Sequence, residues 1–156
     1  MKLLVDADSC PRRLRTIILK AVKNRQIEAL FVADRPLSDV EEAKGEAPVE
    51  MVVVPPGAES ADNYLVEQAK EGFLAITRDI PLASRLTQKG VVVLDDRGGV
   101  FTDENIRERL SLRNLMSDFR EQGLFLEQTK PLSHKEIQLF ANALDRELTR
   151  LLNLKN

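Results

Sequence analysis

Short apolar runs recur along the first two thirds of the chain and are separated by segments with helical spacing. Each run is only four or five residues long and almost entirely apolar, which is typical of a buried strand. The expected strands are residues 2–5, 29–33, 50–54, 73–77 and 91–94. Apolar residues at helical spacing, bounded by proline, polar N-cap residues or glycine, predict helices over residues 11–22, 60–71 and 81–89, with one short turn at 38–41.

Apolar strands that alternate with helices predict a parallel sheet that is covered on both faces. We therefore expect an α/β fold of the doubly wound kind, a three-layer sandwich with a five-stranded parallel sheet. Residues 34–48 are polar and contain Pro36, Gly45 and Pro48, so they form a connection between the second and third strands. The chain shows no internal repeat or linker, and 156 residues are enough for one domain with its own core.

The last third of the chain is expected to be helical. Residues 102–122 have helical spacing, but their apolar residues face two directions, which indicates a break near Ser111 or burial on two sides. Ser133 and Glu136 form a capping box. The helix after it carries one apolar stripe, made by Ile137, Phe140, Ala141, Leu144, Leu148, Leu151 and Leu152. We expect this stripe to pack on the sheet, and a contact between two copies of the chain is the alternative.

Aspartates follow the ends of several predicted strands. Asp6 and Asp8 come after the first strand, Asp79 comes after the fourth, and Asp62 lies in the first turn of the helix after the third. Ligands of an open parallel sheet bind beyond the carboxyl ends of the strands, where the strand order reverses. If the first and fourth strands are neighbours, these carboxylates converge at that point. Alternatively, each aspartate serves its own helix as an N-cap or as a charge favourable to the helix dipole.

Converged carboxylates repel one another unless they are protonated or bind a cation. Two unit charges ~5 Å apart repel by about 3 kcal/mol at an effective dielectric constant of ~20. An oxygen-only ligand set suits Mg²⁺ or Mn²⁺ rather than Zn²⁺, and such an ion activates water and stabilises a phosphoryl oxygen. We therefore predict one metal-binding and catalytic set, Asp6, Asp8, Asp62 and Asp79, whose pKa values are raised by crowding in the metal-free fold.

The composition excludes several other kinds of site. One histidine, His134, and one cysteine exclude multi-histidine metal sites, thiolate zinc sites and an internal disulfide. Cys10, at the start of the first helix, is either an acidified thiol or a packing residue. No apolar run spans a membrane and no signal-peptide pattern is present, so we expect a cytoplasmic protein. The net charge of −2 and the low aromatic content leave local patches as the source of any nucleic-acid binding.

Two groups of arginines are candidates for binding phosphate or RNA. Arg12 and Arg13, followed by Arg15, crowd the first turn of the first helix, where cations oppose the helix dipole. Arg109 and Arg113 fall on one side of the long helix in the last third of the chain. For both groups the alternative is a solvated helix face.

With these residues the chain resembles the YaiI/YqxD family of uncharacterised bacterial proteins, which is considered similar to PIN-like nuclease domains. The resemblance covers most of the chain. It rests on Val5-Asp-Ala-Asp-Ser-Cys-Pro11, Ala61-Asp-Asn63 and Thr77-Arg-Asp-Ile-Pro-Leu-Ala83, and on Ile106-Arg-Glu-Arg-Leu110 together with Arg113 and the expected helix end from Arg120 to Gly123. It implies the strand order 3-2-1-4-5 with an acidic site at the carboxyl edge of the sheet. It also implies a single PIN-like domain over residues 1–156, with residues 102–156 as a helical C-terminal extension packed on it.

The resemblance also bears on individual residues. It matches the four aspartates named above to the acidic positions of the family. The sequence departs from the family pattern at Ser9, at Asn114 and at the pair Asp95-Asp96, so a fifth carboxylate is not implied.

Three functions are consistent with the sequence. The first is a PIN-like ribonuclease that depends on Mg²⁺ or Mn²⁺, with Asp6 and Asp79 as primary ligands. The second is a haloacid-dehalogenase-like phosphohydrolase, because Asp6 and Asp8 match its Asp-x-Asp start, although Pro11 leaves no room for the usual flap. The third is a non-catalytic module that binds RNA or protein. RNA is the expected partner, no membrane or DNA partner is expected, and the chain is expected to be a monomer or a homodimer.

Overall fold

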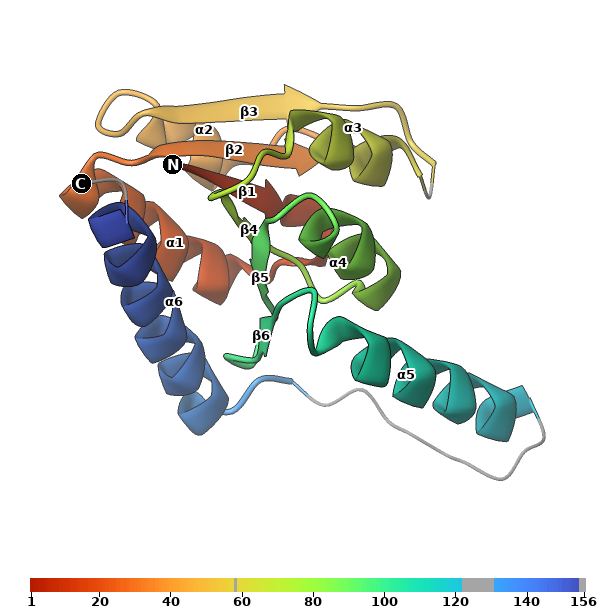
Figure 1. Ribbon diagram of the computed structural model, residues 1–156. Coiled ribbons are helices and arrows are strands. Elements are labelled where there is room, and N and C mark those ends of the chain that lie inside the picture. The colour runs from red at the N-terminus through yellow and green to blue at the C-terminus, as the bar shows by residue number, and fades with distance from the viewer. Residues whose placement is uncertain (58, 122–130, 155–156) are drawn as a thin grey trace.

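The computed structural model contains one sheet between two layers of helices, a three-layer α/β sandwich (Figure 1). It describes residues 1–57, 59–121 and 131–154. The strands in this part of the chain are β1 (Lys2–Asp6), β2 (Glu28–Ala33), β3 (Val49–Val53), β4 (Leu74–Ile76), β5 (Val92–Leu94) and β6 (Val100–Phe101). They lie in the order β3-β2-β1-β4-β5-β6, and β1 to β5 are parallel. The predicted strand order 3-2-1-4-5 is therefore confirmed.

A sixth strand corrects the prediction of a five-stranded sheet. β6 is antiparallel to β5, with Phe101 opposite Val93 and Val100 opposite Leu94. A strand of two residues carries no periodic pattern, so it could not be predicted from the order of apolar and polar residues. It follows the tight turn at residues 95–99 and forms one edge of the sheet.

The helices of the described residues follow the predicted order, with some shifted ends. They are the 3₁₀ helix η1 (Ala7–Ser9) and the α-helices α1 (Arg12–Arg25), α2 (Ser38–Ala43), α3 (Ser60–Gln68), α4 (Ile80–Thr87), α5 (Ile106–Glu121) and α6 (His134–Leu154). α5 begins at Ile106 rather than at residue 102, because Thr102 lies in a turn and donates its N–H to the Asn105 side chain at 2.9 Å. The predicted end of that helix, at residues 122–123, lies outside the described residues. None of the helices described is both long and apolar enough to cross a membrane.

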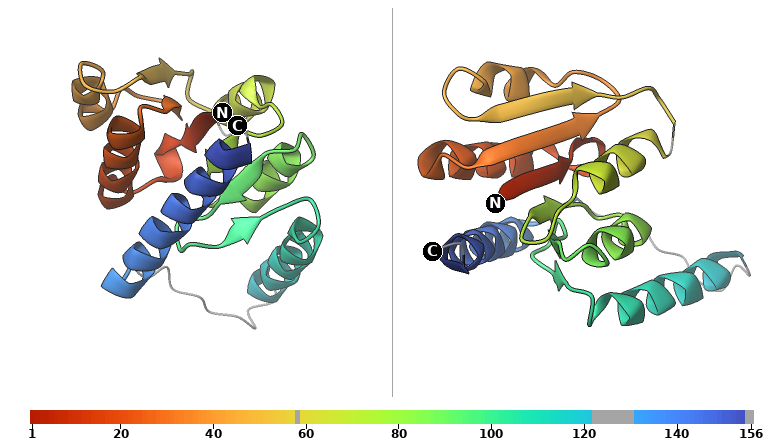
Figure 2. Two further views of the ribbon diagram at one scale, coloured as in Figure 1. Left: turned by 60° about the vertical axis from the view of Figure 1, so that its left-hand side comes forward. Right: turned by 45° about the horizontal axis from the view of Figure 1, so that its top comes forward.

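Alternate residues of the central strand face the two helical layers. Leu3 and Val5 belong to a buried cluster that includes side chains of α1, α2 and α6, whereas Leu4 belongs to one that includes side chains of α3, α4 and the start of α5. The two views in Figure 2 show the same division, with α1 and α6 on one side of the sheet and α3 and α4 on the other. Burial on both faces explains why the strands are almost entirely apolar.

The last helix is part of this packing, as predicted. Ser133 and Glu136 make the expected capping box, with the Glu136 N–H 3.2 Å from Ser133 Oγ and the Ser133 N–H 3.1 Å from Glu136 Oε1. The apolar stripe of α6 is buried against the sheet and α1 through Phe140, Leu144, Leu148 and Leu151. On α5, by contrast, Ile106 is buried, whereas Leu112 and Leu115, which face the other direction, are exposed.

Candidate functional site

The reversal of strand order lies between β1 and β4. From β1 the chain adds β2 and β3 on one side, and then crosses to the other side of β1 to add β4 and β5. The carboxyl ends of β1 and β4 therefore border a crevice of the kind that binds ligands in open α/β sheets. Asp6 ends β1, and Thr77 and Asp79 follow β4 directly.

Asp6 is held in a fixed orientation by two hydroxyl groups. Its side chain is buried, and Oδ2 accepts hydrogen bonds from Thr77 Oγ1 at 2.8 Å and from Ser9 Oγ at 3.0 Å. Within the described residues, no hydrogen bond is made to Oδ1. Burial raises the pKa of Asp6, the two hydroxyl groups oppose this, and the charges of Asp79 and Asp8 add to the rise. Asp6 thus keeps one oxygen, Oδ1, without a hydrogen bond from the described residues.

Asp79 both caps a helix and belongs to the site. Its Oδ1 accepts a hydrogen bond from the N–H of Leu82 at 3.1 Å, so it is the N-cap of α4. Its own N–H donates to Thr77 Oγ1 at 3.0 Å, which connects it through that hydroxyl group to Asp6. The capping role considered for Asp79 is therefore correct, and it leaves Oδ2 without a hydrogen bond from the described residues.

Asp62 approaches the same cluster from the first turn of α3. Burial raises its pKa to about 6, and the charges of Asp79 and Asp6 contribute to the rise, while Arg85 opposes it. The structure therefore brings Asp6, Asp62 and Asp79 within electrostatic reach of one another. Raised pKa values were predicted from crowding, but for both Asp6 and Asp62 burial is the larger cause.

Asp8 lies on the other side of β1. It is exposed, and its Oδ2 accepts a hydrogen bond at 3.0 Å from the N–H of Asp34, just after β2. Burial and Asp34 raise its pKa, while the hydrogen bond lowers it. The suggestion that Asp8 caps the first helix is wrong, because Pro11 occupies the N-cap position of α1.

The carboxylate oxygens of this site suit a hard cation such as Mg²⁺, although few of them lie close enough together to bind one ion. Within residues 1–57, 59–121 and 131–154, no three His, Cys, Asp or Glu side chains are grouped to hold one metal ion. Mg²⁺ often binds through only one or two carboxylates and completes its coordination with water and substrate phosphate. Asp6 Oδ1 and Asp79 Oδ2 accept no hydrogen bond from the described residues and are candidates for this role.

The predicted phosphate-binding arginines differ in what they contact. Arg12 and Arg13 are exposed in the first turn of α1. Arg15 is committed to the fold, since it donates to Asp39 at 2.9 Å and to the carbonyl oxygen of Cys10 at 2.8 Å. The guanidinium of Arg109 lies over the Phe101 ring, 5.5 Å from its centre. Arg113 lies in α5, and its side chain is outside the described residues.

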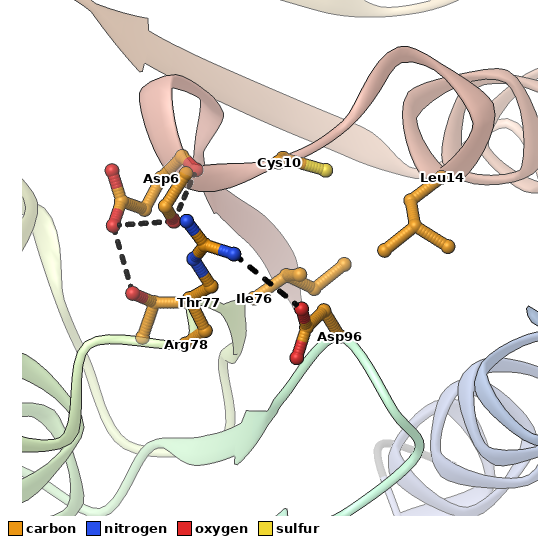
Figure 3. A pocket seen from close by; sticks show the side chains of 8 residues that line it. Asp6, Cys10, Leu14, Ile76, Thr77, Arg78 and Asp96 are labelled. Atoms are coloured by element: carbon orange, nitrogen blue, oxygen red, sulfur yellow. Dashed lines mark hydrogen bonds and ion pairs between the residues drawn. The ribbon is translucent and has the colours of Figure 1, made fainter. Parts of the chain in front are cut away.

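A narrow pocket beside Asp6 contains residues that the sequence analysis did not select. It is lined by Asp6, Ser9, Cys10, Leu14, Ile76, Thr77, Arg78 and Asp96, whose side chains are drawn in Figure 3. Asp96 is buried, and its two oxygens face Arg78 at 4.0 Å and Arg97 at 3.9 Å. Thr77 and Arg78 could have been selected from the sequence, because they lie between β4 and Asp79. Asp96 could not, because nothing in the sequence distinguishes it from its neighbour Asp95 as the pocket residue.

The structure also decides two smaller questions. Cys10 is not an acidified thiol, because burial raises its pKa to about 12, which makes it a packing residue. Asp95 has a local role, since its Oδ1 accepts hydrogen bonds from the N–H groups of Arg97 at 2.8 Å and Gly99 at 2.7 Å within the turn before β6.

Asp62→Asn is expected to stabilise the metal-free protein near neutral pH. A pKa of about 6 in the fold, above the ordinary 3.8, means that the native state binds more protons than the unfolded chain between these values. The free energy of unfolding therefore falls as the pH rises from about 4 to about 6, and the loss persists above pH 6. Allowing for solvent screening and for a lost helix-dipole contribution, the gain from the substitution is about 1 kcal/mol at pH 7.5.

Urea unfolding of both proteins in chelator at pH 7.5 and pH 3.5 measures this effect. The gain is expected at pH 7.5 and is expected to be small at pH 3.5, where the carboxyl group is mostly protonated in both states. Asp103→Asn, which removes an exposed charge from the turn before α5, serves as the control. A lower stability of Asp62→Asn at pH 7.5 would mean that the helix-dipole contribution of Asp62 outweighs its repulsion.

Fold and site together define a class, an α/β protein of the doubly wound kind with a cluster of carboxylates where its strand order reverses. Comparison with known proteins then gives the family. The family described as "Uncharacterized BCR, YaiI/YqxD family" matches residues 4–150, and the chain belongs to it. This confirms the resemblance of the sequence to the YaiI/YqxD family.

Relatives share similarity with almost the whole chain. A UPF0178 protein of Myxococcus xanthus is 49% identical, over 97% of this chain and 96% of its own length. One from Pseudomonas fluorescens is 46% identical over 97% of both chains. A third, from Treponema pallidum, is 44% identical over 99% of this chain and 85% of its own length. These names describe no activity, so the function must be argued from the site.

Proposed function

We propose that this protein is a nuclease of the PIN-like type that depends on Mg²⁺ or Mn²⁺ and hydrolyses phosphodiester bonds in RNA. The observation that carries the proposal is the pair of carboxylates at the reversal of strand order. Asp6 and Asp79 are connected through the Thr77 hydroxyl group, and each leaves one oxygen without a hydrogen bond in the described part of the chain. A sequence with one histidine favours carboxylate chemistry over a histidine-dependent mechanism.

Each residue of the site has a distinct task in this proposal. Asp6 and Asp79 would hold the divalent ion, which when bound activates water and stabilises a phosphoryl oxygen. Thr77 and Ser9 are positioning residues, since their hydroxyl groups fix Asp6 Oδ2 and favour the ionised carboxylate. Asp62 adds negative charge that favours a cation in the crevice. Asp8, directed to Asp34, would act only through its charge.

One structural observation weighs against the phosphohydrolase alternative. η1 begins at Ala7, directly after Asp6, and α1 follows at Arg12, so no flap is inserted after β1. Asp8 is directed to the backbone of Asp34 rather than toward Asp6. A covalent aspartyl phosphate on Asp6 after incubation with a small phosphate ester would nevertheless decide for the phosphohydrolase.

Asp79→Asn is expected to abolish the response of the protein to metal. Asparagine caps a helix about as well as aspartate, so α4 is retained while a ligand and a repelling charge are removed. In chelator the melting temperature is expected to rise slightly, because Asp79 raises the pKa of both Asp6 and Asp62 by repulsion. The wild-type protein is expected to gain about 2.7 kcal/mol of stability at a Mn²⁺ concentration one hundred times its dissociation constant, and Asp79→Asn none.

The test combines thermal melts with cleavage of an end-labelled, single-stranded RNA. Wild type and the control Asp103→Asn are expected to cleave it with Mg²⁺ or Mn²⁺ and not in chelator, and Asp79→Asn is expected to be inactive with either ion. A wild-type protein that neither responds to Mn²⁺ nor cleaves RNA would exclude the metal-dependent nuclease. That result, with RNA binding retained, would favour the non-catalytic module.

A further inference from the structure

Arg78 is placed at the site by the same loop that places Asp79. It lies between Thr77 and Asp79 in the sequence, directly after β4. Its side chain is 52% exposed and lines the pocket that also contains Asp6 and Asp96. Figure 3 shows its guanidinium turned toward Asp96, with Asp6 and Thr77 in the same pocket wall.

The positive charge of Arg78 contributes little to the stability of the fold. The contact of Arg78 with Asp96 is 4.0 Å long, beyond the length of a hydrogen bond. Across the described ranges of the chain, its guanidinium donates no hydrogen bond. A half-exposed ion pair at this distance contributes little to stability, because water screens it. Arg78 therefore keeps its N–H donors available at the rim of the crevice.

Other arginines that the fold places nearby are committed elsewhere. Arg15 donates to Asp39 and to Cys10, and Arg97 donates to Glu136 at the start of α6. Arg97 also approaches Asp96, at the carboxylate oxygen that Arg78 does not face. Asp96, which is 7% exposed, is thus a buried negative charge that attracts the Arg78 guanidinium without accepting a hydrogen bond from it.

We propose that Arg78 is the phosphate-binding residue of this site, in place of Arg12 and Arg13. A crevice with three carboxylates repels an anionic substrate, and a cation beside Asp6 offsets that repulsion. The planar guanidinium can donate two parallel hydrogen bonds to the oxygens of one phosphate group. The inference rests on the proposed function for its substrate, a phosphodiester, but phosphate binding can be measured without any turnover.

The experiment is a titration of the full chain with inorganic phosphate, followed through the arginine side-chain Nε–H signals by NMR. The Arg78 signal is assigned by its loss in Arg78→Lys. Phosphate is expected to shift this signal when Mg²⁺ is present, whether or not it also shifts it in chelator. Arg78→Gln is expected to weaken phosphate binding at least about tenfold. Arg78→Lys keeps the charge but not the paired donors, so its affinity for phosphate is expected to lie between that of the wild type and that of Arg78→Gln.

Two controls make the result specific. Arg146→Gln removes an exposed arginine from α6, outside this pocket, and is expected to bind phosphate like the wild type. Melting temperatures of all variants show whether each is folded; if Arg78→Gln is not, the Arg78→Lys affinity and the wild-type signal shift decide. Phosphate shifts confined to Arg12 and Arg13, with binding lost in a double Arg12→Gln, Arg13→Gln variant, would overturn the inference.

The outcomes also separate this inference from the proposed function. Phosphate binding that depends on Arg78, in a protein that does not cleave RNA, would support the anion site and reject the nuclease. Metal-dependent cleavage with an unchanged KM in Arg78→Gln, and no shift of the Arg78 signal, would support the nuclease and reject the anion site.

Discussion

Asp6→Asn is expected to lower the rate of metal-dependent RNA cleavage by about a thousandfold while the protein stays folded. Asp6 is the most constrained of the carboxylates, because Ser9 and Thr77 both donate to Oδ2 and leave Oδ1 for a ligand. An asparagine in the same place can still accept both hydrogen bonds through its carbonyl oxygen. Its amide group then occupies the position of Oδ1, where it cannot bind a cation.

The stability of this variant provides the internal check. Because burial raises the pKa of Asp6, keeping that carboxylate ionised near neutral pH costs free energy in the fold. The neutral asparagine avoids this cost, so its free energy of unfolding in chelator at pH 7.5 is expected to equal or exceed that of the wild type. Cleavage rates and urea unfolding, with Asp103→Asn as the control, measure both effects. Cleavage by Asp6→Asn at the wild-type rate would remove Asp6 from the catalytic machinery.

Phe140→Ala is expected to lower the free energy of unfolding by about 3–5 kcal/mol. Phe140 is fully buried and belongs to the cluster that also contains Leu3, Val5 and Ile18. Removing its ring leaves a cavity between α6 and the layers it covers. Since domains of this kind are stable by only about 5–15 kcal/mol, the variant would lose a large fraction of its stability.

The adjacent residue supplies a matched control. Leu139 is 48% exposed, so Leu139→Ala is expected to cost less than about 1 kcal/mol. Urea unfolding followed by circular dichroism measures both variants. A Phe140→Ala protein as stable as the wild type would mean that α6 does not contribute to the main core. Two separate transitions would mean that α6 unfolds as its own unit.

The strands could be predicted because they rest on strong and redundant signals, and five apolar runs separated by helices indicate a doubly wound parallel sheet. The order 3-2-1-4-5 was implied by the resemblance to the family and not by the apolar runs. The ends of elements were less predictable, since they depend on single side chains. The start of α5 is set by the side chain of Asn105, which bonds to the N–H of Thr102 and the carbonyl oxygen of Val100. β6 depends on a tertiary pairing that two residues cannot signal.

Within the site, the sequence identified carboxylates but not their supporting contacts. Asp6, Asp62 and Asp79 could be selected because strand ends in a parallel sheet meet at one edge. The hydrogen bond that directs Asp8 toward Asp34 could not be predicted, because it depends on how η1 turns the chain after β1. The place of Thr77 directly after β4 was a signal that it lies at the site, but its role in holding Asp6 could not be predicted, since a hydroxyl group has no pattern that distinguishes positioning from solvation. The pKa of Cys10 was also beyond the sequence, because it follows from burial.

The contact of α6 with the first elements of the chain has a consequence for biosynthesis. Arg25 of α1 bonds to Asp145 and Thr149 of α6, across a sequence separation of 120 residues or more. On the ribosome, the face of β1 and α1 that α6 covers is therefore made early and stays open to solvent until nearly the whole chain has emerged. A nascent or truncated chain that lacks α6 displays this apolar surface, which makes it a substrate for chaperones and proteases and prone to aggregation.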